Sequence, residues 1–174
     1  LNARLEGFRI FAGIESDILP NGQLDYEDHV LASFACIIAS VHSQLRMDEA
    51  TATQRLISAL EHPRTHILGH ATGRLLLSRQ GYPINHRKVI DAAAANGKAI
   101  EVNANPWRLD LDWHWLPYAL ERGVPIAICP DAHSTAGIDD TRYGVMVAQK
   151  GGLTAQHTLN ARTADAFAKW LESR

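Results

Sequence analysis

The sequence predicts an α/β fold built on a mostly parallel sheet, for three reasons that can be read along the chain. Short apolar runs alternate with segments of helical periodicity, which is typical of successive βαβ units. A polar residue follows each run, and these residues are spaced 27, 28, 33 and 28 positions apart. One strand, one helix and two loops need about that length. The 174 residues also suit a single domain with a sizeable core.

Five apolar runs are expected to form the strands. The first covers residues 8–12 and is followed by Glu15. The other four cover residues 36–39, 67–68, 99–102 and 126–128, and the polar residues after them are His42, His70, Asn103 and Asp131. Because function in parallel α/β sheets lies at the carboxyl ends of the strands, we expect these side chains to gather at one edge.

The segments between the runs predict helices. Residues 47–62 and 85–97 repeat apolar side chains every three to four positions, and Asn85 is an expected N-cap. Another helix is expected from Trp115 or Leu116 to Gly123, and a last one after Thr163. Residues 141–152 predict one more short strand or helix.

An open doubly wound sheet and a barrel both fit this alternation. The barrel fits better, because side chains from five strands converge on one point only when the strands surround it. No Gly-rich phosphate-binding loop is present, which weakens the case for a nucleotide-binding sheet.

Composition excludes several classes of protein. The net charge of -2 provides no overall basic field for nucleic acid. There is no run of about 18 apolar residues and no signal-peptide pattern, so we expect a cytoplasmic protein with no membrane partner. Cys36 and Cys129 lie in apolar runs and are interpreted as small buried residues rather than a disulfide.

The polar residues after the strands suggest a metal site. Glu15, His42, His70, Asp131 and His133 supply two carboxylates and three imidazoles, a mixture that suits zinc, manganese or iron. A single histidine after a strand is more often a hydrogen-bonded loop residue, and His66, which precedes a strand, is interpreted as structural. Repetition at equivalent places in successive units favours the metal interpretation. Asp131 and His133 are two apart, so on an extended segment both would face one cluster.

The motifs carry a family resemblance. "GIESDILPNGQLD", "ASVHS", "ILGHATGRLLLSR", "EVNANPWRLDL" and "DAHS" occur in this order in the PHP (polymerase and histidinol phosphatase) family, which the chain resembles from about Gly7 to its end. The resemblance is greatest to the PHP domain at the C-terminus of bacterial family X DNA polymerases. It implies a distorted, TIM-like (β/α)7 barrel with up to three divalent metals, either manganese or zinc, with iron or magnesium as alternatives.

The resemblance also assigns roles to residues. Glu15 matches the bridging glutamate, His42 and His70 match metal histidines, and Asp131 and His133 match the last metal pair. Glu15, Asp131 and His133 are accordingly the expected catalytic residues. The candidate phosphate contacts are Arg74, Arg79 and Arg108, since arginine can hold phosphate with two hydrogen bonds. A surface ion pair is the alternative for each arginine.

Some family features are missing from the sequence. The early HxH motif, the aspartate after it and a later "DHS"-like histidine do not occur. Residues 1–174 are therefore interpreted as one domain, the C-terminal portion of a PHP domain without its first strands. Ala71 and Pro130 stand where the family usually has proline and threonine.

Three functions remain open at this point. The first is a metal-dependent phosphoesterase acting on DNA 3′ ends, as exonuclease or 3′-phosphatase, in a polymerase whose nucleotidyltransferase domain lies upstream. The second is a small-metabolite phosphatase of the histidinol phosphatase type. The third is a degenerate, non-catalytic module with a structural role in a polymerase.

Overall fold

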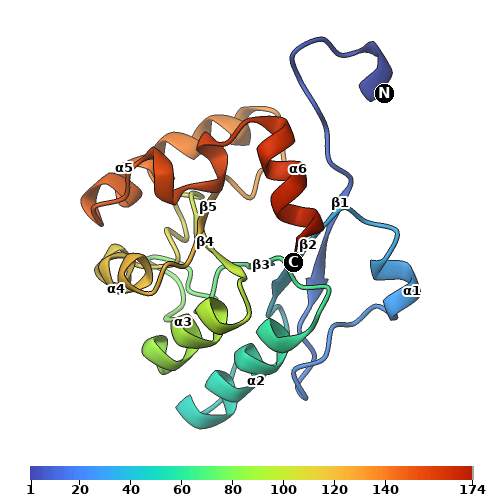
Figure 1. Ribbon diagram of the computed structural model, residues 1–174. Coiled ribbons are helices and arrows are strands. Elements are labelled where there is room, and N and C mark those ends of the chain that lie inside the picture. The colour runs from blue at the N-terminus through green and yellow to red at the C-terminus, as the bar shows by residue number, and fades with distance from the viewer. Residues whose placement is uncertain (174) are drawn as a thin grey trace.

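A computed structural model describes residues 1–173 and contains one parallel sheet of five strands (Figure 1). The strands are β1 (Gly13–Asp17), β2 (Cys36–Ser40), β3 (Ile67–Leu68), β4 (Ala99–Asn103) and β5 (Ile126–Cys129). The expected runs from 36 onward are therefore confirmed as strands, with β2, β4 and β5 each one residue longer than expected. The parallel α/β class is confirmed as well.

The expected strand at residues 8–12 is wrong. The first strand begins at Gly13, which pairs with Cys36, and it ends at Asp17 opposite Ser40. Residues 8–12 have no partner strand, and Phe8 is 66% exposed. The prediction was based on the apolar composition of residues 8–12, but a strand also requires a partner for its backbone groups. Glu15 consequently lies in the middle of β1 rather than beyond its end.

The helices follow the sequence expectations closely. They are α1 (Asp28–Leu31), α2 (Glu49–Glu61), α3 (His86–Ala95), α4 (Leu116–Glu121), α5 (Thr141–Lys150) and α6 (Ala164–Glu172). Short 3-10 turns lie at η1 (Asn2–Arg4), η2 (Trp113–Trp115), η3 (Ala136–Asp140), η4 (Ala155–His157) and η5 (Leu159–Ala161). Asn85 caps α3 by accepting a hydrogen bond from the Lys88 amide at 3.1 Å, as expected. The ambiguous segment 141–152 forms α5 over Thr141–Lys150, and of the α-helices among residues 1–173 only the single turn α1 was not expected.

The strand order increases steadily from β1 to β5. A doubly wound sheet reverses its order at a switch point, so this alternative does not describe the chain. A barrel wall has the steady order, but β1 and β5 are the two edges of the sheet within residues 1–173. Closure into a barrel therefore stays a prediction.

Alternate side chains of a strand point to opposite faces of the sheet, so the strands contribute residues to two apolar clusters. Ile37, Leu68 and Ile100 belong to the main cluster, which includes buried residues of α2 and α3. Ile67, Ala99 and Ala127 point to the other face and form a second cluster with Trp170 and Leu171 of α6. In Figure 1 the strands lie between α6 and the pair α2 and α3. Both faces of β3, β4 and β5 are thus covered.

Two further expectations concern cysteines and membranes. Cys36 and Cys129 are free thiols that pack against the second cluster, so no disulfide forms between them. Burial raises the pKa of the Cys36 thiol to about 11. Among residues 1–173, no helix has the length and apolar character needed to cross a bilayer.

Candidate metal centre

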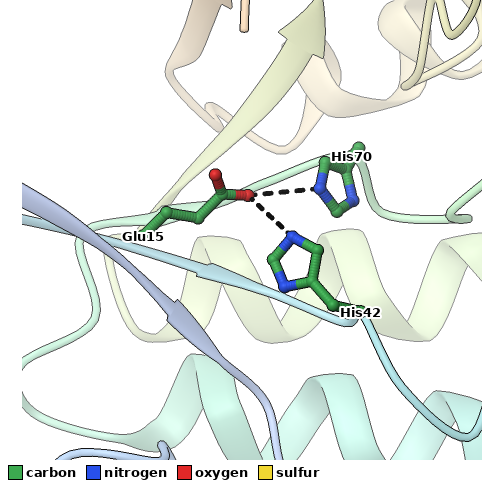
Figure 2. A group of neighbouring side chains, drawn as sticks. All are labelled: Glu15, His42 and His70. Atoms are coloured by element: carbon green, nitrogen blue, oxygen red, sulfur yellow. Dashed lines mark ion pairs between the residues drawn. The ribbon is translucent and has the colours of Figure 1, made fainter. Parts of the chain in front are cut away.

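Three of the expected ligands meet: Glu15 from the middle of β1, and His42 and His70 from just beyond the carboxyl ends of β2 and β3 (Figure 2). One carboxylate oxygen of Glu15 lies 3.3 Å from His42 Nε2 and 3.2 Å from His70 Nε2. One ligand atom from each residue lies within 4.8 Å of the other two. This group of three residues, called the metal cluster below, has the donors and the spacing to hold one divalent ion.

Local structure explains why these side chains converge. Glu15 pairs in register with Ile38 of β2, while His42 and His70 each lie two residues beyond the end of a neighbouring strand. Gly69 permits the close approach of those strand ends, because a Cβ there would lie 2.3 Å from Ser40 Oγ. The glycine before His70 is thus required by packing.

Asp17 fixes the orientation of His42. Its carboxylate accepts hydrogen bonds from the His42 amide at 2.9 Å and from the Ser43 hydroxyl at 3.2 Å. The His42 Nδ1 atom lies 3.6 Å from the same carboxylate, on the side of the ring opposite Glu15. A carboxylate behind a ligand histidine orients the ring and increases its basicity. Sequence reasoning missed Asp17, although its place two residues after Glu15 puts both on one face of β1.

The charges in the metal cluster are coupled. Hydrogen bonds from His42 and His70 hold the pKa of Glu15 far below its usual range, against the opposing effect of burial. The Glu15 carboxylate in turn raises the pKa of His42. His70 is only 2% exposed, and its Nδ1 atom is buried without a hydrogen-bond partner. The metal-free cluster therefore favours a proton on His42, which a metal ion would have to displace.

Asp131 and His133 lie outside this cluster. The structure ends β5 at Cys129 and places Asp131 in the left-handed region, at φ +52°. The segment is therefore not extended, as the sequence argument assumed, although His133 Nδ1 still lies 3.8 Å from the Asp131 carboxylate. Asp131 is 15% exposed, whereas His133 is 86% exposed and bonds through Nδ1 to the Asp131 carbonyl oxygen at 2.8 Å.

A buried chain of hydrogen bonds connects Asp131 to the metal cluster. The His70 amide donates to Glu101 at 2.6 Å, and Asn103 Nδ2 lies 3.3 Å from the same Glu101 oxygen. The same Asn103 nitrogen lies 3.2 Å from the Asp131 carboxylate. Burial raises the pKa of Glu101 to about 7, partly offset by its hydrogen bonds. Sequence reasoning missed Glu101, although a carboxylate in the middle of the apolar run 99–102 was a usable signal.

The three candidate phosphate contacts are largely engaged within the protein. Arg74 donates to the Arg108 carbonyl oxygen at 2.8 Å, to the Leu109 carbonyl oxygen and to the Asp112 carboxylate at 2.8 Å. Arg79 donates twice to the Gly73 carbonyl oxygen. Arg108 Nε lies 3.3 Å from Asp131, and its buried Nη1 has no partner. Of the three, only Arg108 contacts an expected metal ligand.

His66 is a structural residue, as expected. Its Nδ1 accepts a hydrogen bond from the Ile37 amide at 3.1 Å, and its Nε2 lies 3.3 Å from the Leu171 carbonyl oxygen. It therefore joins β2 to α6 and is separate from the metal cluster.

Comparison with known proteins confirms the family resemblance, although no family model matches the chain. The chain is 44% identical over 172 residues to the DNA polymerase/3′-5′ exonuclease PolX of Bacillus subtilis (strain 168). That match covers 97% of this chain and 30% of PolX. The chain thus spans less than a third of the length of that relative.

Probable phosphatases form the second group of relatives. One from Thermoanaerobacter sp. (strain X514) is 29% identical over 170 residues, covering 92% of this chain and 67% of the phosphatase. Another, from Caldanaerobacter subterraneus subsp. tengcongensis, is 30% identical over 140 residues, covering 75% of this chain and 53% of the phosphatase.

Proposed function

Because the chain belongs to the same family as PolX and these probable phosphatases, we propose that it is a metal-dependent phosphoesterase module acting on DNA 3′ ends. The observation that carries the proposal is the convergence of Glu15, in the middle of β1, with His42 and His70, just beyond the carboxyl ends of β2 and β3. We further propose that the chain is part of a longer cytoplasmic polymerase with an upstream nucleotidyltransferase domain, and that its sheet is part of a TIM-like PHP barrel. The match covers only 30% of PolX, which supports the proposal of a longer protein.

The residues of the cluster fit a divalent metal such as manganese or zinc. A bound metal supplies a Lewis acid that stabilises charge on a phosphoryl group and makes water more acidic. Glu15, His42 and His70 hold it, and Asp17 keeps the His42 ring in place. We assign Asp131 and His133 to the same centre by their family motif. The connection from Asp131 through Asn103 and Glu101 to His70 supports this assignment for Asp131.

Roles for the arginines follow from their surroundings. Arg108 is the best-placed candidate for a phosphate contact, because it lies beside Asp131 and has a donor without a partner. Such a donor next to the metal centre would bind an anionic oxygen of the substrate. Arg74 and Arg79 remain proposed phosphate contacts, with part of their hydrogen-bonding capacity already used.

Substitution of Asp131 tests the proposal. In the longer protein, Asp131→Ala should lower 3′→5′ hydrolysis of a labelled oligonucleotide by at least about 100-fold, since a catalytic metal ligand is lost. Nucleotidyl transfer should be largely unchanged, because it uses separate upstream carboxylates. The matched control is Asp165→Ala, which removes an exposed carboxylate from α6. Equal loss of both activities would reject a catalytic role and favour a structural module.

A small-metabolite phosphatase is the second candidate, favoured by the probable phosphatases that match 92% of the chain. Hydrolysis of a panel of phosphate monoesters, measured beside the oligonucleotide, separates the two functions. Faster turnover of a monoester than of the oligonucleotide would select the phosphatase.

A further inference from the structure

A groove of about 650 Å³ begins at the metal cluster, since His42 belongs to both. One wall is the loop after β2, residues 44–47, and the other wall is the segment 79–83 that follows β3. The volume falls in the range of about 300–1,000 Å³ that is common for ligand pockets, and it exceeds what one phosphate group needs.

The charged side chains along the groove are of one sign. Arg46 and Arg79 line it together with His42, and no acidic residue does. Arg46 is exposed, and among residues 1–173 its side chain has no hydrogen-bond or ion-pair partner. Arg79 donates to the Gly73 carbonyl oxygen, and within the described residues it is paired with no carboxylate. The net charge of the chain is -2, so this basic lining is a local feature that suits an anionic ligand.

Two further observations point to a ligand in the groove. Tyr82 lines it, and the Tyr82 hydroxyl is buried without a hydrogen-bond partner. Buried hydroxyl groups normally have partners, so this hydroxyl keeps an unused capacity for a hydrogen bond beside the groove. Gln44 adopts a left-handed backbone conformation with φ +51°, which is unfavourable for a side chain of this kind. Such strain is most often kept where a binding site requires it.

On the basis of the proposed phosphoesterase function, we propose that this groove binds the nucleic-acid strand adjoining the phosphodiester that is cleaved at the metal cluster. Arg46 contacts one backbone phosphate, and Arg79 contacts a second. Leu45 and Met47, which are both half-buried, offer apolar surface to the bases and sugars. A positively charged groove that follows the backbone is a common way to bind a single strand without sequence preference. A small monoester would have no use for a site of this length.

Binding of a single-stranded oligodeoxynucleotide to the 174-residue chain tests the inference. Fluorescence anisotropy in EDTA, over a range of salt concentrations, measures binding while hydrolysis is prevented. Arg46→Ala should weaken binding at least about 3-fold and reduce the slope of log K against log salt by about 0.7, as expected for one lost phosphate contact. Arg46→Lys should restore most of the affinity, since it keeps the charge.

Arg64→Ala is the matched control, because Arg64 is exposed and lies before β3, at the other end of the strand from the metal cluster. It should change neither the affinity nor the salt slope. Equal effects of Arg46→Ala and Arg64→Ala would overturn the inference, as would a wild-type chain that binds no oligonucleotide at low salt. Hydrolysis of bis(4-nitrophenyl) phosphate by the longer protein with added manganese tests the phosphoesterase separately. The groove and the proposed function can therefore fail independently.

Discussion

At the scale of single residues, the Glu15–His42 contact makes both folding stability and metal affinity depend on pH. As pH rises, the two change in opposite directions. The folded-state pKa of His42 is raised, so its contribution to stability is fully present below its ordinary value and is lost as pH rises through the raised value. Metal binding requires His42 to lose its proton, so affinity increases over the same rise in pH. The metal-free chain is therefore best stabilised where it binds metal least.

Glu15→Gln should lower the pKa of His42 in the metal-free chain, because the carboxylate that stabilises the imidazolium is removed. An NMR titration of the His42 ring measures this value directly. Glu6→Gln is the control, since Glu6 is exposed in the segment before β1. An unchanged His42 pKa in Glu15→Gln would show that the contact in Figure 2 does not persist in solution.

Glu101 predicts a second pH effect. Its pKa is raised by burial from 4.5 to about 7, so the unfolded chain releases this proton at lower pH than the folded chain does. The contribution of Glu101 to stability should therefore fall between about pH 4.5 and 7 and stay level above that range.

Glu101→Gln keeps the acceptor for the His70 amide and removes the charge. The difference in free energy of unfolding between Glu101→Gln and wild type should be roughly 2–3 kcal/mol more favourable to the variant at pH 8 than at pH 5. Urea unfolding in EDTA at both pH values measures the difference, with Glu121→Gln as an exposed control. Parallel pH profiles for wild type and Glu101→Gln would contradict a raised pKa.

The residues of the metal cluster were predictable from sequence because each follows or lies in a strand at a repeating interval. Asp17 and Glu101 were harder to identify, since their role depends on which backbone amides they accept from. Those contacts are set by neighbouring strands and not by spacing along the chain. The position of His133 outside the metal cluster follows a left-handed residue, Asp131, and an apolar run followed by Pro130 does not indicate that backbone conformation.

At the scale of elements, Arg55 attaches α2 to the loops that follow β1 and β2. It is 2% exposed, and its Nε lies 3.0 Å from the Ile18 carbonyl oxygen and 2.9 Å from that of Leu19. Its Nη1 donates to the Ser43 carbonyl oxygen at 3.1 Å. These loops continue directly from Asp17 and His42, so the helix holds the metal side of the sheet in place.

Arg55→Met should lower the free energy of unfolding by about 2–4 kcal/mol, because buried carbonyl oxygens lose a charged donor. Manganese affinity should decrease with it. Urea unfolding and isothermal titration measure the two effects, and Gln54→Met provides an exposed neighbour on the same helix as control. Loss of metal affinity with unchanged stability would mean that Arg55 acts on the site by some other route.

Helices were easier to predict than the first strand. Asn85, Asp48 and Thr163 each cap a helix through a local hydrogen bond, so sequence alone marks the starts of α3, α2 and α6. The limits of β1 depend on where β2 lies, since Gly13 pairs with Cys36. Pairing between distant segments is not encoded in the composition of either one.

At the scale of the whole molecule, the number of converging ligands limits what the chain can do by itself. Three ligand residues meet in the metal cluster, whereas the family resemblance implies up to three metals. Isothermal titration of the 174-residue chain with manganese or zinc should therefore show at most one site, and nuclease activity should be negligible. Two or more tight sites together with nuclease activity would contradict this expectation.

Sequence reasoning identified the α/β class because every βα unit repeats the same pattern. Whether the sheet closes depends on its two edge strands, β1 and β5, which carry no such repeating signal. The overall curvature of the sheet is a property of all five strands together.

The steady strand order also determines the order in which the strands can pair during synthesis. Each strand pairs with the one that leaves the ribosome just before it, so no pairing has to wait for a distant segment. Glu15, His42 and His70 all lie within the first 70 residues of the chain. A nascent chain can therefore bring the three ligands together while β4 and β5 are still being made. Asp131 is synthesised later and packs beside a metal cluster that has already formed.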